Sequence, residues 1–254
     1  MLHFFIAAGF AIFTWWFSTG AILYVDRSPP STYPRSFAVA STLSFIALAG
    51  LLLSAKTATP LGAYMSFSSA LVLWGWHELT FLMGWVTGPR RHPCPPEATG
   101  WRRFRLATEV VIHHELALFA TLVLIIALTW GAPNRVGLWT FTVLWTMRIS
   151  AKLNIFLGVR NLAEEFIPSH LEYMTTYFRK ATYNPLMPIS LTASLGTVWL
   201  LALEGLEGGS SVQRSIETAL VGTLLGLAAL EHLFLMLPVP DTLLWRWALR
   251  DQSS

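Results

Sequence analysis

Long apolar segments, separated by shorter polar ones, dominate the pattern of this chain. Most are about 20 residues long, the length of an α-helix that crosses the hydrocarbon core of a bilayer. We predict transmembrane helices at roughly 3–25, 36–55, 61–87, 105–130, 138–158, 185–204 and 216–237. The first segment lacks a basic start and a small-residue cleavage site, so we interpret it as a span and not as a signal peptide. The pattern therefore predicts one all-α integral membrane domain over residues 1–254, a polytopic bundle of about seven helices.

Two of the polar connections are long enough to have a structure of their own. The stretch Gly88–Arg105 is rich in proline and arginine, and it is typical of a loop on an anionic membrane surface. The stretch Arg160–Tyr183 is too polar to span a bilayer. Its apolar residues recur at helical spacing, which predicts one interfacial amphipathic helix. These residues are Leu171, Met174, Tyr177 and Phe178.

The basic residues fall unevenly on the two sides of the predicted bundle. With seven spans, one side holds twelve of them: Arg27, Arg35, Arg90, Arg91, Arg102, Arg103, Arg105, Arg160, Arg179, Lys180, Arg246 and Arg250. The other side holds Lys56, Arg135 and Arg214. Because cytoplasmic loops carry the excess of Lys and Arg, we expect a multi-pass membrane protein. Its N-terminus would be outside and its C-terminus cytoplasmic.

Composition supports the membrane class. The chain is 54% hydrophobic and 12% charged, whereas soluble domains carry about 25% charged residues. The net charge of +3 is explained by loop arginines that set orientation, so we expect the lipid membrane, and no nucleic acid, as a partner. The single cysteine, Cys94, excludes an internal disulfide and a CxxC pair.

The fifth predicted span carries charge where the bilayer disfavours it. Arg148 and Lys152 lie four residues apart, on one helical face, with Asn154 nearby. A charge at mid-bilayer costs roughly 2.5–3.5 kcal/mol on insertion scales, so such residues occur where other helices supply polar partners. At 1.5 Å of rise per residue, candidate partners from the other spans fall in the same layer. They are Glu78, Glu115 and Glu231, with His77, His114 and His232 adjacent.

Several interpretations of this polar centre are open. Arg148, Lys152 and Asn154 with one or two acids could form buried pairs that fix helix register. Surplus carboxylates beside histidines are typical of a di-metal carboxylate site, with iron favoured, although the usual Glu-x-x-His spacing is absent. Its candidate ligands are Glu78, His114, Glu115, Glu165, Glu231 and His232. A third interpretation makes His114 or His232 the axial ligand of a tetrapyrrole.

Motifs spread over nearly the whole chain are similar to those of one family. They are WWFSTGAIL, WGWHEL (Trp74–Leu79), TGPRRHPCPP, HEL (His114–Leu116), WGAPNRVGLWTF, RISAKLNIFLGV (Arg148–Val159) and LEHLFLMLPVPDTLLWRW. On these motifs the chain resembles the photosynthetic complex assembly protein 2 (PuhE-like) family of phototrophic bacteria. That family is linked to the gene cluster of the reaction-centre H subunit. The resemblance implies a role in building the reaction centre and its antenna, but it supplies no catalytic residues. It also implies the bacterial inner (intracytoplasmic) membrane, with a periplasmic N-terminus, and bacteriochlorophyll or a precursor as the tetrapyrrole.

Two classes of function follow. The leading one is an assembly or pigment-supply factor that contacts reaction-centre or light-harvesting subunits, or pigment-synthesis enzymes. The alternative is a membrane-embedded, metal-dependent oxidoreductase acting on a tetrapyrrole or isoprenoid intermediate. Whether the chain is an enzyme is left open, and the catalytic residues are unknown. An ion or proton conduit ranks last, because the polar residues lie mainly in one half of the membrane.

Overall fold

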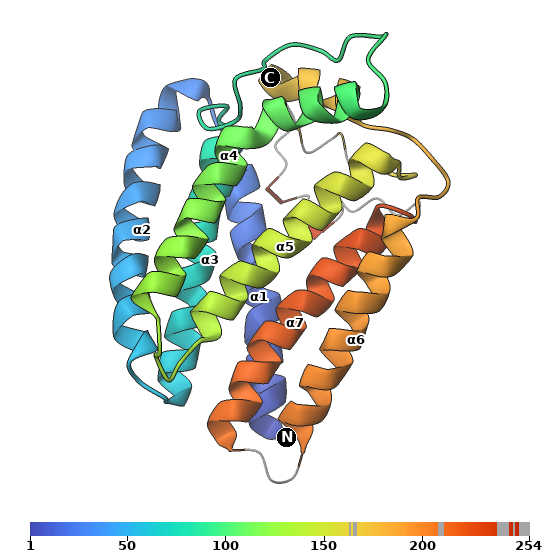
Figure 1. The fold of residues 1–254 in the computed structure, drawn as a ribbon. Coiled ribbons are helices and arrows are strands. Elements are labelled where there is room, and N and C mark those ends of the chain that lie inside the picture. The colour runs from blue at the N-terminus through green and yellow to red at the C-terminus, as the bar shows by residue number, and fades with distance from the viewer. Residues whose placement is uncertain (163, 165–166, 208–210, 238–243, 246, 249–254) are drawn as a thin grey trace.

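The computed structural model is a bundle of long α-helices that run up and down (Figure 1). It describes the chain except residues 163, 165–166, 208–210, 238–243, 246 and 249–254. The described elements are α1 (Leu2–Asp26), η1 (Pro30–Thr32), α2 (Tyr33–Ala55), α3 (Pro60–Leu82), α4 (Gly100–Leu128), α5 (Val136–Leu157), η3 (Ser169–Tyr177), α6 (Leu186–Leu206) and α7 (Val212–Phe234). The all-α prediction is confirmed, and each predicted span coincides with one of the α-helices.

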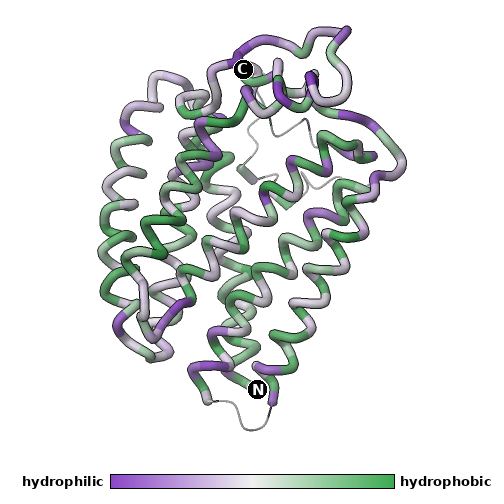
Figure 2. The backbone as a smooth tube through the Cα atoms, viewed as in Figure 1, coloured by the Kyte–Doolittle hydropathy of each residue, from purple (hydrophilic) through white to green (hydrophobic). Residues whose placement is uncertain are grey.

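Five segments are long and apolar enough to cross a membrane: α1, η1 with α2, α4, α6 and α7. Hydrophilic residues gather at helix ends and loops, whereas the helix shafts are largely hydrophobic (Figure 2). Helix α3 and helix α5, with 23 and 22 residues, lie outside that set. They carry Glu78 and the pair Arg148 and Lys152 within apolar sequence. By helix length and hydropathy, the chain is a multi-pass membrane protein.

The helices form an inner and an outer group. Helices α1, α3, α5 and α7 contact one another, while α2 packs on α3, α6 packs on α7, and α4 packs on α5 and α3. The outer helices leave large apolar side chains exposed, such as Phe45 on α2 and Trp199 on α6. Exposed apolar faces of this kind are what lipid tails cover.

Helix ends are set by local chemistry. Thr59 accepts a hydrogen bond from the backbone N–H of Gly62 at 3.1 Å, and Pro60 opens α3. Pro suits this position because the first N–H of a helix has no intrahelical partner. At the other end, Gly84 adopts φ +74°, a left-handed conformation that ends helices and favours glycine. Helix α3 therefore stops at Leu82, shorter than the predicted 61–87.

The connection before α6 contains a helix where one was predicted. One interfacial amphipathic helix was expected within Arg160–Tyr183, and the structure has a 3₁₀ helix, η3, there. The spacing explains its type, because Leu171, Met174 and Tyr177 recur every three residues, the period of a 3₁₀ helix. All three are buried and pack in one cluster with Phe81 of α3 and neighbouring apolar residues. The apolar face of η3 thus covers the bundle.

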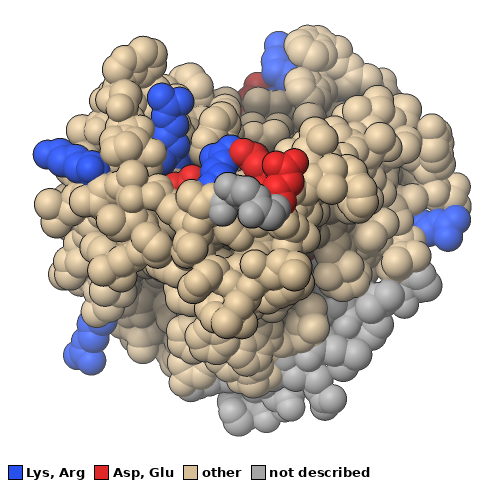
Figure 3. All heavy atoms as spheres, turned by 90° about the horizontal axis from the view of Figure 1, so that it is seen from below, with Lys and Arg blue, Asp and Glu red and all other residues tan. Residues whose placement is uncertain are grey.

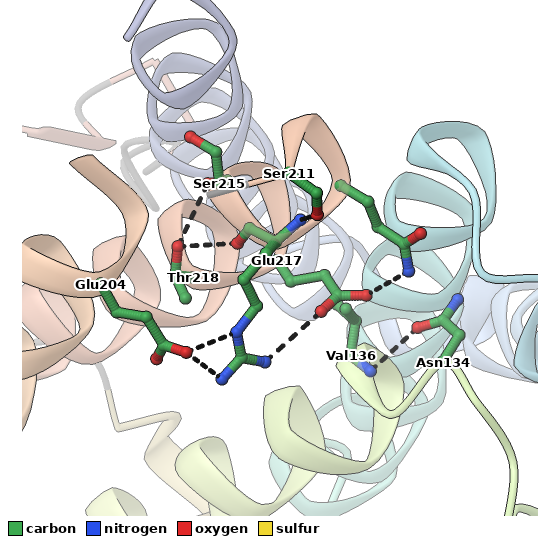
Figure 4. Close-up of polar contacts among 9 residues, drawn as sticks. Asn134, Val136, Glu204, Ser211, Ser215, Glu217 and Thr218 are labelled. Carbon is green, nitrogen blue, oxygen red and sulfur yellow. Dashed lines mark hydrogen bonds and ion pairs between the residues drawn. The ribbon is translucent and has the colours of Figure 1, made fainter. Parts of the chain in front are cut away.

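The two ends of the bundle differ in charge, as the sequence predicts. The connections with the loop arginines lie at one end, together with η3 (Figure 1). The face seen from the opposite end carries sparse charged side chains (Figure 3). There Arg214 donates to Glu204 at 2.7 Å and lies 3.5 Å from Glu217, and Ser211 caps α7 (Figure 4). This network joins the ends of α6 and α7.

Candidate functional site

The first part of the polar centre is an ion pair between α3 and α5. Arg148 donates from Nη2 to Oε2 of Glu78 at 2.7 Å. The second oxygen of Glu78 lies 3.7 Å from Nε2 of His114 on α4. His114 is fully buried, and its ring centroid lies 4.6 Å from that of Phe81. Glu78 thus lies between a cation on α5 and an imidazole on α4, and it joins three helices.

A second ion pair joins α4 to α5. Lys152 donates to Oε1 of Glu115, and Trp145 donates from its indole N–H to the other oxygen at 3.3 Å. The ammonium nitrogen of Lys152 also lies 5.3 Å from the ring centroid of Phe81, within the range of a cation–π contact. In the described part of the chain, each of the two α5 cations therefore has one carboxylate partner.

The remaining candidates on α7 point to different partners. Glu231 accepts from the indole N–H of Trp15 on α1 at 3.1 Å. His232 is bonded at both ring nitrogens, to Ala228 O at 2.8 Å and to the Ser150 hydroxyl at 2.9 Å. Asn154, predicted in the polar centre, donates to the carbonyl of Ser150 at 2.9 Å. His232, Ser150 and Asn154 therefore form a polar contact between α7 and α5, apart from the ion pairs.

Other polar residues have structural partners. His77 Nε2 on α3 bonds the Thr121 hydroxyl on α4 at 2.8 Å, a contact between two packed helices. Glu109 pairs with exposed Arg105 at 3.6 Å on one face of α4. Surface pairs of this kind contribute little to stability.

A cavity of about 610 Å³ lies beside both ion pairs, within the roughly 300–1,000 Å³ range typical of ligand sites. Its wall comes from α1, α3, α4, α5, α7 and the η3 segment. The lining is mainly apolar and aromatic. The charged residues that line it are Glu78, Glu115, Arg148, Lys152 and Glu231. The structure thus joins predicted site residues from four helices in the wall of one lipophilic cavity.

Helix η3 covers part of this cavity with Leu171, Met174 and Tyr177, and the connection between α3 and α4 bonds to η3. The hydroxyl of Tyr177 accepts from Arg90 Nε at 2.5 Å and donates to the carbonyl of His92 at 3.0 Å. This contact raises the pKa of the Arg90 guanidinium. Arg103 donates to the carbonyls of Tyr177 at 2.5 Å and Phe156 at 3.3 Å. Since Tyr177 also lines the cavity, these bonds hold its cover in place.

The metal hypothesis gains no support from this geometry. Among the residues that the structure describes, no group of three or more His, Cys, Asp or Glu side chains could hold a metal ion. Glu165, a predicted ligand, lies outside the described residues. Of the other five, Glu78 and Glu115 pair with cations and Glu231 accepts from an indole. His232 bonds a carbonyl and a hydroxyl, and His114 lies 3.7 Å from the Glu78 carboxylate. His114 and His232, the predicted tetrapyrrole ligands, are not among the described residues of the cavity wall.

Two tryptophans of the site were not predicted from the sequence. Trp15 and Trp145 each donate to a carboxylate of the cavity wall, whereas tryptophans of membrane proteins are most often anchors at span ends. The signal was present, because both lie well inside their predicted spans. An indole N–H inside a membrane needs an acceptor, so a mid-span tryptophan indicates a polar neighbour.

Comparison with known proteins gives a family and a relative. A protein of Rhodobacter capsulatus, named as an uncharacterized 30.4 kDa protein in the puhA 5' region, is 40% identical over 250 residues. The alignment covers 94% of this chain and 88% of that protein. No solved structure matches the chain. The profile of DUF3623, described as a protein of unknown function, matches residues 1–254, and the chain therefore belongs to the DUF3623 family.

Proposed function

We propose that this chain is a membrane factor for assembly of the bacterial photosynthetic apparatus, or for its pigment supply, and that it holds a lipophilic molecule. The motif resemblance to the PuhE-like family supports this role. So does the name of the Rhodobacter capsulatus relative, which refers to the puhA 5' region. Bacteriochlorophyll or a precursor is the molecule that the role suggests.

The cavity and its charged wall are the observation that carries the proposal. Four charged side chains from three helices are kept inside the membrane, at a cost that helix packing alone does not require. They line an apolar space that several helices share. Ligand sites commonly combine a lipophilic wall with a few placed polar groups. A molecule transferred between membrane proteins needs a site of this kind.

The charge asymmetry extends the proposal to orientation and partners. We place the arginine-rich end in the cytoplasm and the N-terminus in the periplasm, following the excess of Lys and Arg. The exposed apolar faces of α2 and α6 are then available to lipid or to neighbouring membrane subunits. Reaction-centre subunits, light-harvesting subunits and pigment-synthesis enzymes are the proposed partners.

A deletion strain complemented with variants tests this function. Ala151 of α5 lines the cavity, so Ala151→Phe reduces its volume without removing a charge. Ala193→Phe on the exposed face of α6 is the matched control. We expect the deletion and Ala151→Phe to lower reaction-centre or antenna absorption in isolated membranes, and Ala193→Phe to restore it. Wild-type levels of assembled complexes in the deletion strain would overturn the proposal.

A further inference from the structure

The ion pairs expose their cations more than their carboxylates. The side chain of Arg148 is 40% exposed, against 11% for its partner Glu78. The side chain of Lys152 is 26% exposed, against 18% for Glu115. All four line the cavity. Within the two ion pairs, the groups most available to a molecule in the cavity are therefore hydrogen-bond donors. The fifth charged residue of the wall, Glu231, is an exposed acceptor for the indole N–H of Trp15.

Arg148 and Lys152 carry more N–H groups than their bonds to the two carboxylates use. An arginine carries five N–H donors and a lysine three. In the described part of the chain, the Arg148 guanidinium donates to Glu78 and the Lys152 ammonium donates to Glu115. The remaining N–H groups would lose water if an apolar molecule filled the cavity. A bound molecule compensates for that loss when it brings a hydrogen-bond acceptor of its own.

The charge balance restricts what kind of acceptor it is. Arg148 with Glu78, and Lys152 with Glu115, already cancel one another. A ligand carboxylate or phosphate would add a negative charge without a cation left to neutralise it, and burying such a charge is unfavourable. An uncharged acceptor satisfies the N–H groups and leaves the balance unchanged.

We propose that the cavity binds an uncharged lipophilic molecule whose polar end is a carbonyl group, as in an ester, a ketone or an amide. The carbonyl oxygen accepts from Arg148 and Lys152, and the apolar body lies among the aromatic and aliphatic residues of the wall. This inference rests on the proposed function, since both place a lipophilic molecule in one cavity. Binding and assembly are nevertheless measured separately.

The test compares two fluorescent probes with the same chain and different polar ends. The purified full chain, in mild detergent at pH 8, is titrated with the methyl ester of cis-parinaric acid and with the free acid. Trp15, Trp74 and Trp145 line the cavity, so energy transfer from tryptophan reports binding. We expect saturable binding of the ester, and weaker binding of the ionised acid. Acid binding as tight as ester binding, or no saturable ester binding, would overturn the inference.

Variants assign the signal to the site. Arg148→Lys keeps a cation for Glu78 but replaces five N–H donors with three on a smaller group, so ester binding should weaken roughly fivefold, the effect of one hydrogen bond. Ala151→Phe should abolish binding of both probes, and Arg135→Lys, an exposed arginine outside the described cavity wall, should change neither. Circular dichroism confirms that each variant is folded. Ester binding unchanged in Arg148→Lys overturns the role of the guanidinium.

The two proposals fail in different ways. In one outcome, the chain binds the ester as expected but the deletion strain has normal photosynthetic complexes. That result refutes the proposed function and supports the ligand class. The opposite result is loss of photosynthetic complexes in the deletion strain while the purified chain binds the acid probe better than the ester. That result refutes the ligand class and leaves the assembly role standing.

Discussion

Replacing Glu78 by glutamine removes one charge of a buried pair and keeps the shape of the side chain. Arg148 loses its carboxylate, from which its Nη2 lies 2.7 Å away. His114, 3.7 Å from the same carboxylate, loses it too. The remaining arginine is left inside a helical bundle without a counter-charge, which a bilayer strongly disfavours. We therefore expect Glu78→Gln to destabilise the protein more than a typical surface change.

The magnitude follows from burial. Two unit charges about 4 Å apart attract by about 4 kcal/mol at an effective dielectric constant of 20. Removing one partner of a fully buried pair typically costs about 3–5 kcal/mol. Because the Arg148 side chain is 40% exposed, part of its charge is screened, and the cost should lie below this range. We expect a loss of about 2 kcal/mol in the free energy of unfolding.

A double-mutant cycle measures this value. Glu78→Gln, Arg148→Met and the double variant are unfolded in mild detergent with increasing denaturant, under reversible conditions. The double variant should be more stable than the sum of the single changes predicts, by at least about 1 kcal/mol. The exposed Arg105–Glu109 pair is the control and should couple by less than about 0.5 kcal/mol. Additive effects at Glu78 and Arg148 would refute the ion-pair account.

Three further predictions concern packing, the cover and metal content. Gly137→Leu should destabilise the bundle by several kcal/mol in thermal unfolding, because a β-carbon there would lie 2.6 Å from the Ser66 hydroxyl and overpack the α3–α5 contact; unchanged stability would contradict that packing. Tyr177→Phe removes the hydroxyl bonds to Arg90 and His92, so limited proteolysis should cut the connection between α3 and α4 faster than in the wild type; equal rates would contradict its role in the cover. Because Glu78 and Glu115 are committed to cations, elemental analysis should find no stoichiometric iron, manganese or zinc; one metal atom per chain would revive the oxidoreductase alternative.

Much of the fold follows from the sequence, because bilayer thickness fixes how long an apolar helix must be. The predicted helix boundaries and types differ from the structure where polar residues form part of a helix. Helix α4 begins at Gly100 and not near 105, since Trp101, Arg102 and Arg103 hide its first turn from a hydropathy window. At η3, spacing of three and spacing of 3.6 residues could not be told apart over so short a segment.

The sequence predicts which charged residues form the polar centre, but not which acid pairs with which cation. Arg148 and Lys152 had to meet acids, because charges inside a membrane need partners. Which acid each one meets depends on how the helices are rotated and which of them are neighbours, and one sequence does not fix either. The cavity was not predictable at all. Its wall combines residues of α1, α3, α4, α5, α7 and η3, and no local sequence pattern records how these elements pack.

The central claim is that the cavity holds a lipophilic molecule, and one measurement tests it most directly. The wild-type chain and Ala151→Phe are purified from phototrophically grown membranes in mild detergent. Organic extracts of both are compared by absorption and mass spectrometry. The account predicts a stoichiometric, carbonyl-bearing lipophile in the wild-type extract that is depleted in the variant. Identical extracts from the two proteins would contradict it.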